Sequence, residues 1–179
     1  DTRRFDFERA AQSPGWLKEM RGEHVPETQE YGIASTVYRA VRPFHPERFF
    51  NVIDRPWTNG KLLRSKGFFW LASKYQEAGS WSQAGGLMRY GYAGRWWRFV
   101  PQDQWPEDAE IRAEILKKWL PETADCRQEL VFIGQHIDFS ALTVELDACL
   151  LTDAEVAMGP EAWLQLSDPF GDWYSEVAA

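Results

Sequence analysis

The strongest strand signal in this 179-residue chain is the stretch Leu62-Leu63-Arg64-Ser65-Lys66-Gly67-Phe68-Phe69-Trp70-Leu71-Ala72, residues 62–72. Successive side chains on a β-strand point to opposite faces. One face of this strand is small and apolar, suits packing on helices, and consists of Leu63, Ser65, Gly67, Phe69 and Leu71. The other face combines two cations with two aromatic rings and consists of Arg64, Lys66, Phe68 and Trp70. This alternation predicts a sheet with helices on one side.

The segments on either side predict an α+β fold. Further strands are expected at 33–41, 80–88, 95–100 and 130–133, where short apolar or β-forming runs occur. Helices are expected from Pro46, which follows His45 at the cap position, at 107–120, and after the cap residue Asp138. Thr152 and Glu155 form a capping-box pattern that opens another short helix. This order resembles a split β-α-β arrangement, and a mainly antiparallel four- to five-stranded sheet with helices packed on one face satisfies it.

The face of the 62–72 strand that carries cations and aromatic rings is the candidate binding surface. It is too polar for a core and too aromatic for an ordinary solvated surface, which indicates contact with an anionic partner or another domain. Trp81, Trp96 and Arg98 on the following strands are expected to extend it. The alternative is that these side chains only cover the open side of the sheet, with cations lying beside rings.

Charge is segregated along the chain, although the net charge is -7. Residues 33–105 carry eleven Lys or Arg against four Asp or Glu, whereas residues 106–179 carry four against sixteen. A basic centre can attract an anionic partner. We favour the interpretation that the two segments face each other within one domain, or face a neighbouring domain. The ten tryptophans are likewise assigned to core and interface packing.

Motifs for catalysis or tight metal binding are absent from the sequence. It contains neither of the glycine-rich nucleotide signatures, no Gly-x-Ser-x-Gly, no His-Glu-x-x-His and no Cys-x-x-Cys. Cys149 falls on the apolar stripe of its helix and is expected to be inert, whereas the position of Cys126 allows exposure. Of three scattered histidines, His24 between Glu23 and Glu27 is the weak metal candidate. We expect this chain alone to be no enzyme.

Size and cysteine content limit the cellular setting. The chain has no run of eighteen apolar residues and opens on no signal peptide. Its two cysteines cannot form a disulfide framework and suggest a reducing compartment. We therefore expect a cytoplasmic protein that contacts no membrane. Because Asp1 rather than methionine comes first, we also expect an excised fragment or a processed product.

Several separated blocks of the sequence resemble one family in the same order. They are Tyr-Gly-Ile-Ala-Ser-Thr-Val-Tyr-Arg-Ala-Val-Arg-Pro-Phe-His-Pro-Glu-Arg-Phe (31–49), the 62–72 strand, Trp-Ser-Gln-Ala-Gly (81–85), Arg-Gln-Glu-Leu-Val-Phe-Ile-Gly (127–134), Leu-Asp-Ala-Cys-Leu-Leu-Thr-Asp (146–153) and Asp-Pro-Phe (168–170). Residues 31–170 thus resemble the C-terminal domain of the CobW family. Residues 1–30 resemble the arm and linker that join this domain to the family's N-terminal GTPase domain, and 171–179 form a tail.

The resemblance implies a function. CobW-family proteins are P-loop GTPases that act as metallochaperones for zinc, cobalt or related ions, with links to cobalamin synthesis and nitrile hydratase activation. Their P-loop and Cys-x-Cys-Cys metal site lie in the N-terminal domain, which is missing here. No cofactor is then expected for this chain, whereas the full-length protein would use GTP, magnesium and zinc or cobalt. The His-rich linker of many relatives is reduced here to His24, which puts linker metal storage in doubt.

The same resemblance implies partners for the isolated domain. They are the N-terminal GTPase domain of the same protein and a metalloprotein client. An accessory role would couple the nucleotide state to metal release and recognise the client. Arg64, Lys66 and Trp70 are the candidate surface for this docking.

A nucleic-acid-binding module is the competing interpretation. Some RNA-binding domains stack bases on aromatic rings of a similar sheet, and residues 33–105 supply positive charge. Against it, the aromatic RNA-binding motif with its Lys/Arg-Gly-Phe/Tyr core is absent. The acidic segment 106–179 would also repel a phosphate backbone. Nucleic acid is therefore an unlikely partner.

Overall fold

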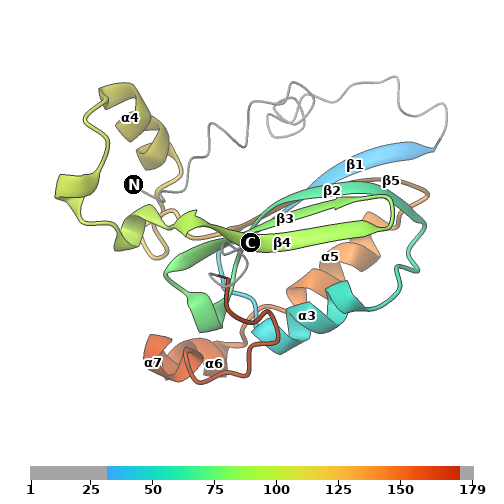
Figure 1. Ribbon diagram of the computed structural model, residues 1–179. Helices are drawn as coiled ribbons and strands as arrows, with labels where there is room; N and C mark the ends of the chain where they lie inside the picture. Colours follow the sequence, from blue (N-terminus) through green and yellow to red (C-terminus); the bar gives the residue numbers. More distant parts are fainter. Residues whose placement is uncertain (1–31, 174–179) are drawn as a thin grey trace.

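A computed structural model describes residues 32–173, and the fold is a five-stranded antiparallel sheet with helices (Figure 1). The strands are β1 (Ile33–Ala40), β2 (Lys61–Trp70), β3 (Glu77–Ala84), β4 (Leu87–Arg95) and β5 (Gln128–Gln135). Their order across the sheet is β1-β5-β2-β3-β4, and every neighbouring pair is antiparallel. The predicted α+β class and sheet type are confirmed.

The helices lie mainly on one side of this sheet. Helices α3 (Pro46–Asp54) and α5 (Phe139–Asp147) run beneath it, and the short α6 (Asp153–Met158) and α7 (Pro160–Trp163) lie on the same side (Figure 1). Helix α4 (Ala109–Lys117) lies on the other side. The Asp138 carboxylate accepts from the Ala141 N–H at the start of α5, and Thr152 and Glu155 complete the capping box of α6. These two predicted caps are confirmed, whereas His45 occupies the N-cap position of α3 without a capping hydrogen bond from its side chain.

An aromatic core fills the space between the sheet and α3 with α5. Phe49 of α3 is fully buried and stacks on Phe44, with ring centroids 4.2 Å apart. It also contacts Trp81 of β3 and, near the end of the described chain, Phe170. Much of the aromatic content therefore serves packing, because large rings supply apolar area to a modest core.

The hairpin β3–β4 departs from two of the predicted strands. The expected strand 80–88 runs through Gly85, whose φ of +57° belongs to the turn between β3 and β4. The expected strand 95–100 is instead the end of β4 followed by a 3-10 helix, η3 (Trp97–Phe99). Here the Trp97 and Arg98 N–H groups donate to the buried carboxylate of Asp125, at 2.8 and 3.0 Å, rather than to a neighbouring strand.

Ion pairs join the basic and acidic segments of the chain within the domain. Five pairs link residues 33–105 to residues 106–179 and are Arg39–Glu129, Arg42–Asp153, Arg48–Glu155, Arg55–Glu145 and Lys74–Asp168. The second and third of these pairs attach α6 to the segment around the start of α3. Much of the charge segregation is therefore neutralised internally, as we favoured from the sequence.

The Arg48–Glu155 pair predicts an acid-sensitive stability. Two hydrogen bonds from the Arg48 guanidinium, at 2.8 and 2.6 Å, hold the pKa of the Glu155 carboxyl at about 2 instead of 4.5. A carboxyl with a depressed folded-state pKa stabilises the fold above its unfolded pKa, and this contribution is lost as pH falls. We expect urea unfolding to show a stability loss between pH 4.5 and 2 that Glu155→Gln reduces. Glu161→Gln, an exposed site on α7, is the control, and equal pH profiles for the two variants would contradict the prediction.

Candidate functional site

The aromatic part of the predicted binding surface is buried. Phe68 and Trp70 do point away from α3 and α5, as predicted, but each is only 5% exposed. They form a second core cluster with Trp96, Cys126 and Val131. The segment that follows β4 thus returns over this end of the sheet, and the predicted exposure of the two rings is wrong.

Trp81 lies on the opposite face from the one predicted. It pairs directly with Gly67 across β2 and β3, so it shares the face of Gly67 rather than that of Lys66. Its ring is 5% exposed in the core above α3, and its indole N–H donates to Ser65 Oγ at 2.6 Å. Trp81 is therefore a core residue.

Arg98 lies in η3 rather than on a strand. Its guanidinium is exposed and donates to the Glu122 carbonyl at 2.7 Å. Burial raises the pKa of the Asp125 carboxyl that anchors η3. The hydrogen bonds from the Trp97 and Arg98 N–H groups offset part of this rise. Arg98 therefore helps to hold the segment that follows β4 against residues 122–125.

The rest of the predicted surface is a cationic patch on the side of the sheet away from α3. Arg64 is exposed, Lys66 is half-buried, and Lys66 lies in register with Ser82 and then Arg89 of β4. We call the set Arg64, Lys66, Ser82, Ala84 and Arg89 the uncovered face. Within residues 32–173, no acidic side chain forms an ion pair with Arg64 or Arg89. Arg64 and Arg89 therefore give the uncovered face positive charge that no acidic side chain of the described residues pairs with.

Arg89 was missed by the sequence reasoning. Placing the hairpin turn at Gly85 and Gly86 would have set Arg89 opposite Ser82, on the face of Lys66. At the other end of this sheet face, Glu129 is 4% exposed and accepts from Arg127 Nε at 2.7 Å. Burial, followed by the charge of Arg127, lowers the pKa of nearby Lys118. At this covered end Glu129 thus pairs with cations, unlike the uncovered face.

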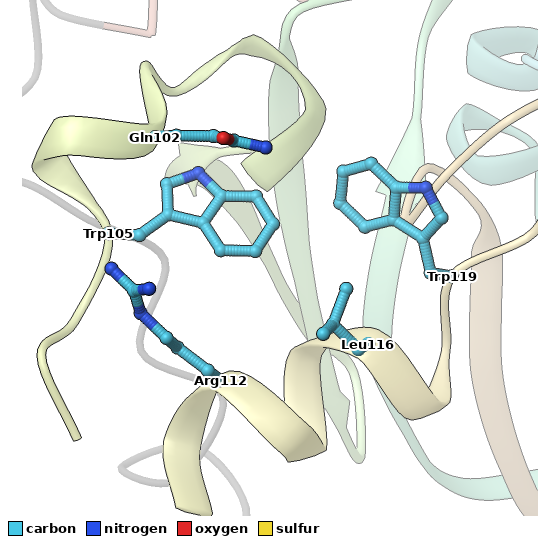
Figure 2. A pocket seen from close by; sticks show the side chains of 5 residues that line it. All are labelled: Gln102, Trp105, Arg112, Leu116 and Trp119. Atoms are coloured by element: carbon cyan, nitrogen blue, oxygen red, sulfur yellow. The ribbon is translucent and has the colours of Figure 1, made fainter. Parts of the chain in front are cut away.

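A second candidate surface is an aromatic cleft beside α4. Gln102, Trp105, Arg112, Leu116 and Trp119 line a pocket of about 320 Å³ (Figure 2). The two indoles have centroids 5.5 Å apart, and Figure 2 shows Leu116 lying below the space between them. Trp97 extends the aromatic series, with its ring 5.8 Å from that of Trp105. We call these five lining residues the tryptophan cleft, which no sequence motif had singled out.

Neither cysteine is placed for reactivity. Cys126 is fully buried, contrary to the exposure that its position allowed, and burial raises the pKa of its thiol well above the usual range. Cys149 lies in the core just beyond the end of α5, where burial raises its pKa to about 11, as expected for an inert core residue. Across residues 32–173, no three His, Cys, Asp or Glu side chains gather where they could hold a metal ion. His24, the metal candidate, lies outside the described residues.

The nucleic-acid alternative loses the rings on which it depended. Base stacking needs exposed aromatic faces, and both Phe68 and Trp70 are buried. For the part of the chain that the structure covers, no helix has the length and apolar character of a membrane span.

The chain is similar to several known proteins. The model of the family described as "Cobalamin synthesis protein cobW C-terminal domain" matches residues 33–150. Zinc-regulated GTPase metalloprotein activator 1 of Dictyostelium discoideum is 46% identical over 170 residues, which are 92% of this chain and 35% of that protein. Zinc chaperone Rv0106 of Mycobacterium tuberculosis is 29% identical over 145 residues, which are 80% of this chain and 36% of that protein. This chain thus spans about a third of the length of these curated relatives.

Solved structures give a more distant similarity. The crystal structure of Zn(II)-bound YjiA GTPase from E. coli is 16% identical, with a TM-score of 0.46. The similarity covers 72% of this chain and 33% of that one.

Proposed function

Because the chain belongs to the CobW C-terminal domain family, we propose that it is the accessory domain of a GTP-dependent metallochaperone for zinc or cobalt. In this role it docks on the N-terminal GTPase domain of the same protein, couples nucleotide state to metal release and helps to recognise a metalloprotein client. GTP, magnesium and the transported metal belong to the GTPase part. The domain itself supplies binding surfaces and carries out no hydrolysis.

The observation that carries this proposal is the uncovered face. The fold neutralises much of its positive charge through the five ion pairs with the acidic segment, yet Arg64 and Arg89 stay outside them. Their small neighbours Ser82 and Ala84 are exposed, which leaves a flat strand surface between the cations. Complementary charge steers association and suppresses wrong partners. The proposed contact is therefore an acidic surface on the GTPase domain.

Charge reversal on the uncovered face tests the docking. We expect Arg64→Glu with Arg89→Glu to weaken binding to the GTPase part of the Dictyostelium relative about tenfold or more, which corresponds to roughly 1.4 kcal/mol. The measurement is calorimetric titration with GTP and zinc present.

The matched control changes the same net charge elsewhere. Arg55→Glu with Lys117→Glu alters two exposed cations after α3 and at the end of α4. Exposed ion pairs such as theirs contribute little to stability. Equal weakening by both double variants would show non-specific attraction and reject the uncovered face as the docking surface.

A further inference from the structure

We infer that the tryptophan cleft is a docking site for a partner peptide that carries an apolar side chain next to lysine or arginine. This site goes beyond the proposed docking on the GTPase domain. It uses α4 and the segment around it rather than the uncovered face of the sheet.

Helix α4 carries apolar side chains that stay exposed in the described part of the chain. None of its residues is buried. Ile111 is 38% exposed, Leu116 is 54% exposed, and Leu120 just beyond the helix is 42% exposed. A helix of a soluble domain usually buries its apolar stripe against the core, and clustered exposed apolar side chains mark interaction sites. The cleft shares Leu116 with this set of exposed apolar residues.

The cleft is held in shape by contacts that do not involve its open side. The Trp105 indole N–H donates to the Val100 carbonyl at 2.9 Å, and Arg112 Nε donates to the Pro106 carbonyl. Beyond α4, Leu120 and Ala124 exchange two backbone hydrogen bonds, at 2.9 and 2.8 Å. A site that is already ordered lowers the entropy lost on binding.

The charged residues close in sequence to the cleft favour a cationic partner. Asp103, Glu107, Glu110 and Glu122 are exposed and form no ion pair with any side chain of residues 32–173. Residues 102–122 carry six Asp or Glu against three Lys or Arg, so acidic side chains outnumber cations near the cleft. Lys117 pairs with Glu114, Lys118 is half-buried and senses the charges of Arg127 and Glu129, and Arg112 is tied to Pro106.

The indole faces support the same choice. A Lys or Arg side chain over a tryptophan ring gains a cation–π attraction, and an apolar side chain fills the space above Leu116. The two requirements together describe a basic, apolar peptide segment. An acidic segment would meet like charge from the exposed carboxylates on either side of the cleft residues in the sequence.

The test uses the whole chain and three labelled peptides in fluorescence anisotropy. The probe is Lys-Lys-Leu-Leu-Lys-Lys, and its counterparts carry Glu in place of each Lys or Ser in place of each Leu. We expect the probe to bind at least tenfold more tightly than either counterpart, with affinity that falls as salt is added. Leu116→Ser should weaken it at least tenfold. Leu164→Ser removes a leucine of matched exposure, 53%, beyond α7, and should leave binding unchanged.

Other outcomes overturn the inference. Equal binding of the basic and acidic peptides, no binding of any peptide, or no effect of Leu116→Ser would each reject a basic, apolar partner. A concentration-dependent dimer in sedimentation that Leu116→Ser abolishes would assign the cleft to a second copy of the chain instead. The Arg64→Glu, Arg89→Glu variant should keep peptide binding, so failure of this site and failure of the proposed GTPase docking give different results.

Discussion

Replacing Gln128 by leucine should lower the free energy of unfolding by about 2 kcal/mol or more, because the buried Trp70 N–H and the Arg42 carbonyl would lose the partner that Gln128 supplies. Gln128 begins β5 and is fully buried. Its side-chain amide donates to the carbonyls of Arg42 and Trp70, both at 2.9 Å, and its Oε1 accepts from the Trp70 N–H at 2.9 Å. One side chain thereby joins the end of β2 to the segment after β1.

Urea denaturation followed by tryptophan fluorescence measures this loss. Gln165→Leu makes the same chemical change at an exposed position near the end of α7 and should change stability by less than about 0.5 kcal/mol. A loss below about 1 kcal/mol for Gln128→Leu would mean that water or a local shift satisfies the Trp70 N–H and the Arg42 carbonyl.

Gly67→Ala should prevent stable folding or lower the free energy of unfolding by more than about 3 kcal/mol, because the sheet has no room for a methyl group there. A Cβ at this position would lie 2.0 Å from the Glu129 carbonyl oxygen and 2.8 Å from Leu130 Cα. Both atoms belong to the backbone of β5, so neither can move aside without shifting a central strand. The backbone φ of +157° at Gly67 adds to the strain.

Gly91→Ala is the matched control, since Gly91 also lies within a strand, β4. A Cβ there meets nothing within 4 Å, and we expect a native-like amide spectrum and a stability change under about 1 kcal/mol. For Gly67→Ala we expect loss of the dispersed amide resonances or a much earlier thermal transition. Similar stabilities for the two variants would show that β5 can move away from β2.

Local sequence signals predicted much of the fold. The alternation in residues 62–72 correctly separated Phe69, which lies in the core above α3, from Phe68 and Trp70 on the other side. The caps at Asp138 and Thr152 were also predictable, because a helix start depends on a few neighbouring residues. These features need no knowledge of distant contacts.

The errors arose where distant contacts decide the outcome. Trp81 was assigned to the wrong face because strand register depends on its pairing with Gly67, which alternation within one strand does not reveal. The burial of Phe68 and Trp70 depends on Trp96 and Cys126, which lie on segments well beyond β2. Arg89 was missed because its face also depends on strand pairing. The tryptophan cleft was missed because its residues come together only in the folded segment.

The position of β5 also governs how this domain can be made. Strand β5 is the last strand among the described residues, yet it lies between β1 and β2 and is the neighbour through which β1 joins the sheet. Roughly ninety residues separate β1 from this partner. At typical ribosome speeds their synthesis takes about 4 to 18 s. During this interval β1 and β2 have unpaired edges, and a chain stopped before Gln128 lacks the strand that connects them. The nascent domain is therefore most open to chaperones, and most prone to aggregate, before its last strand emerges.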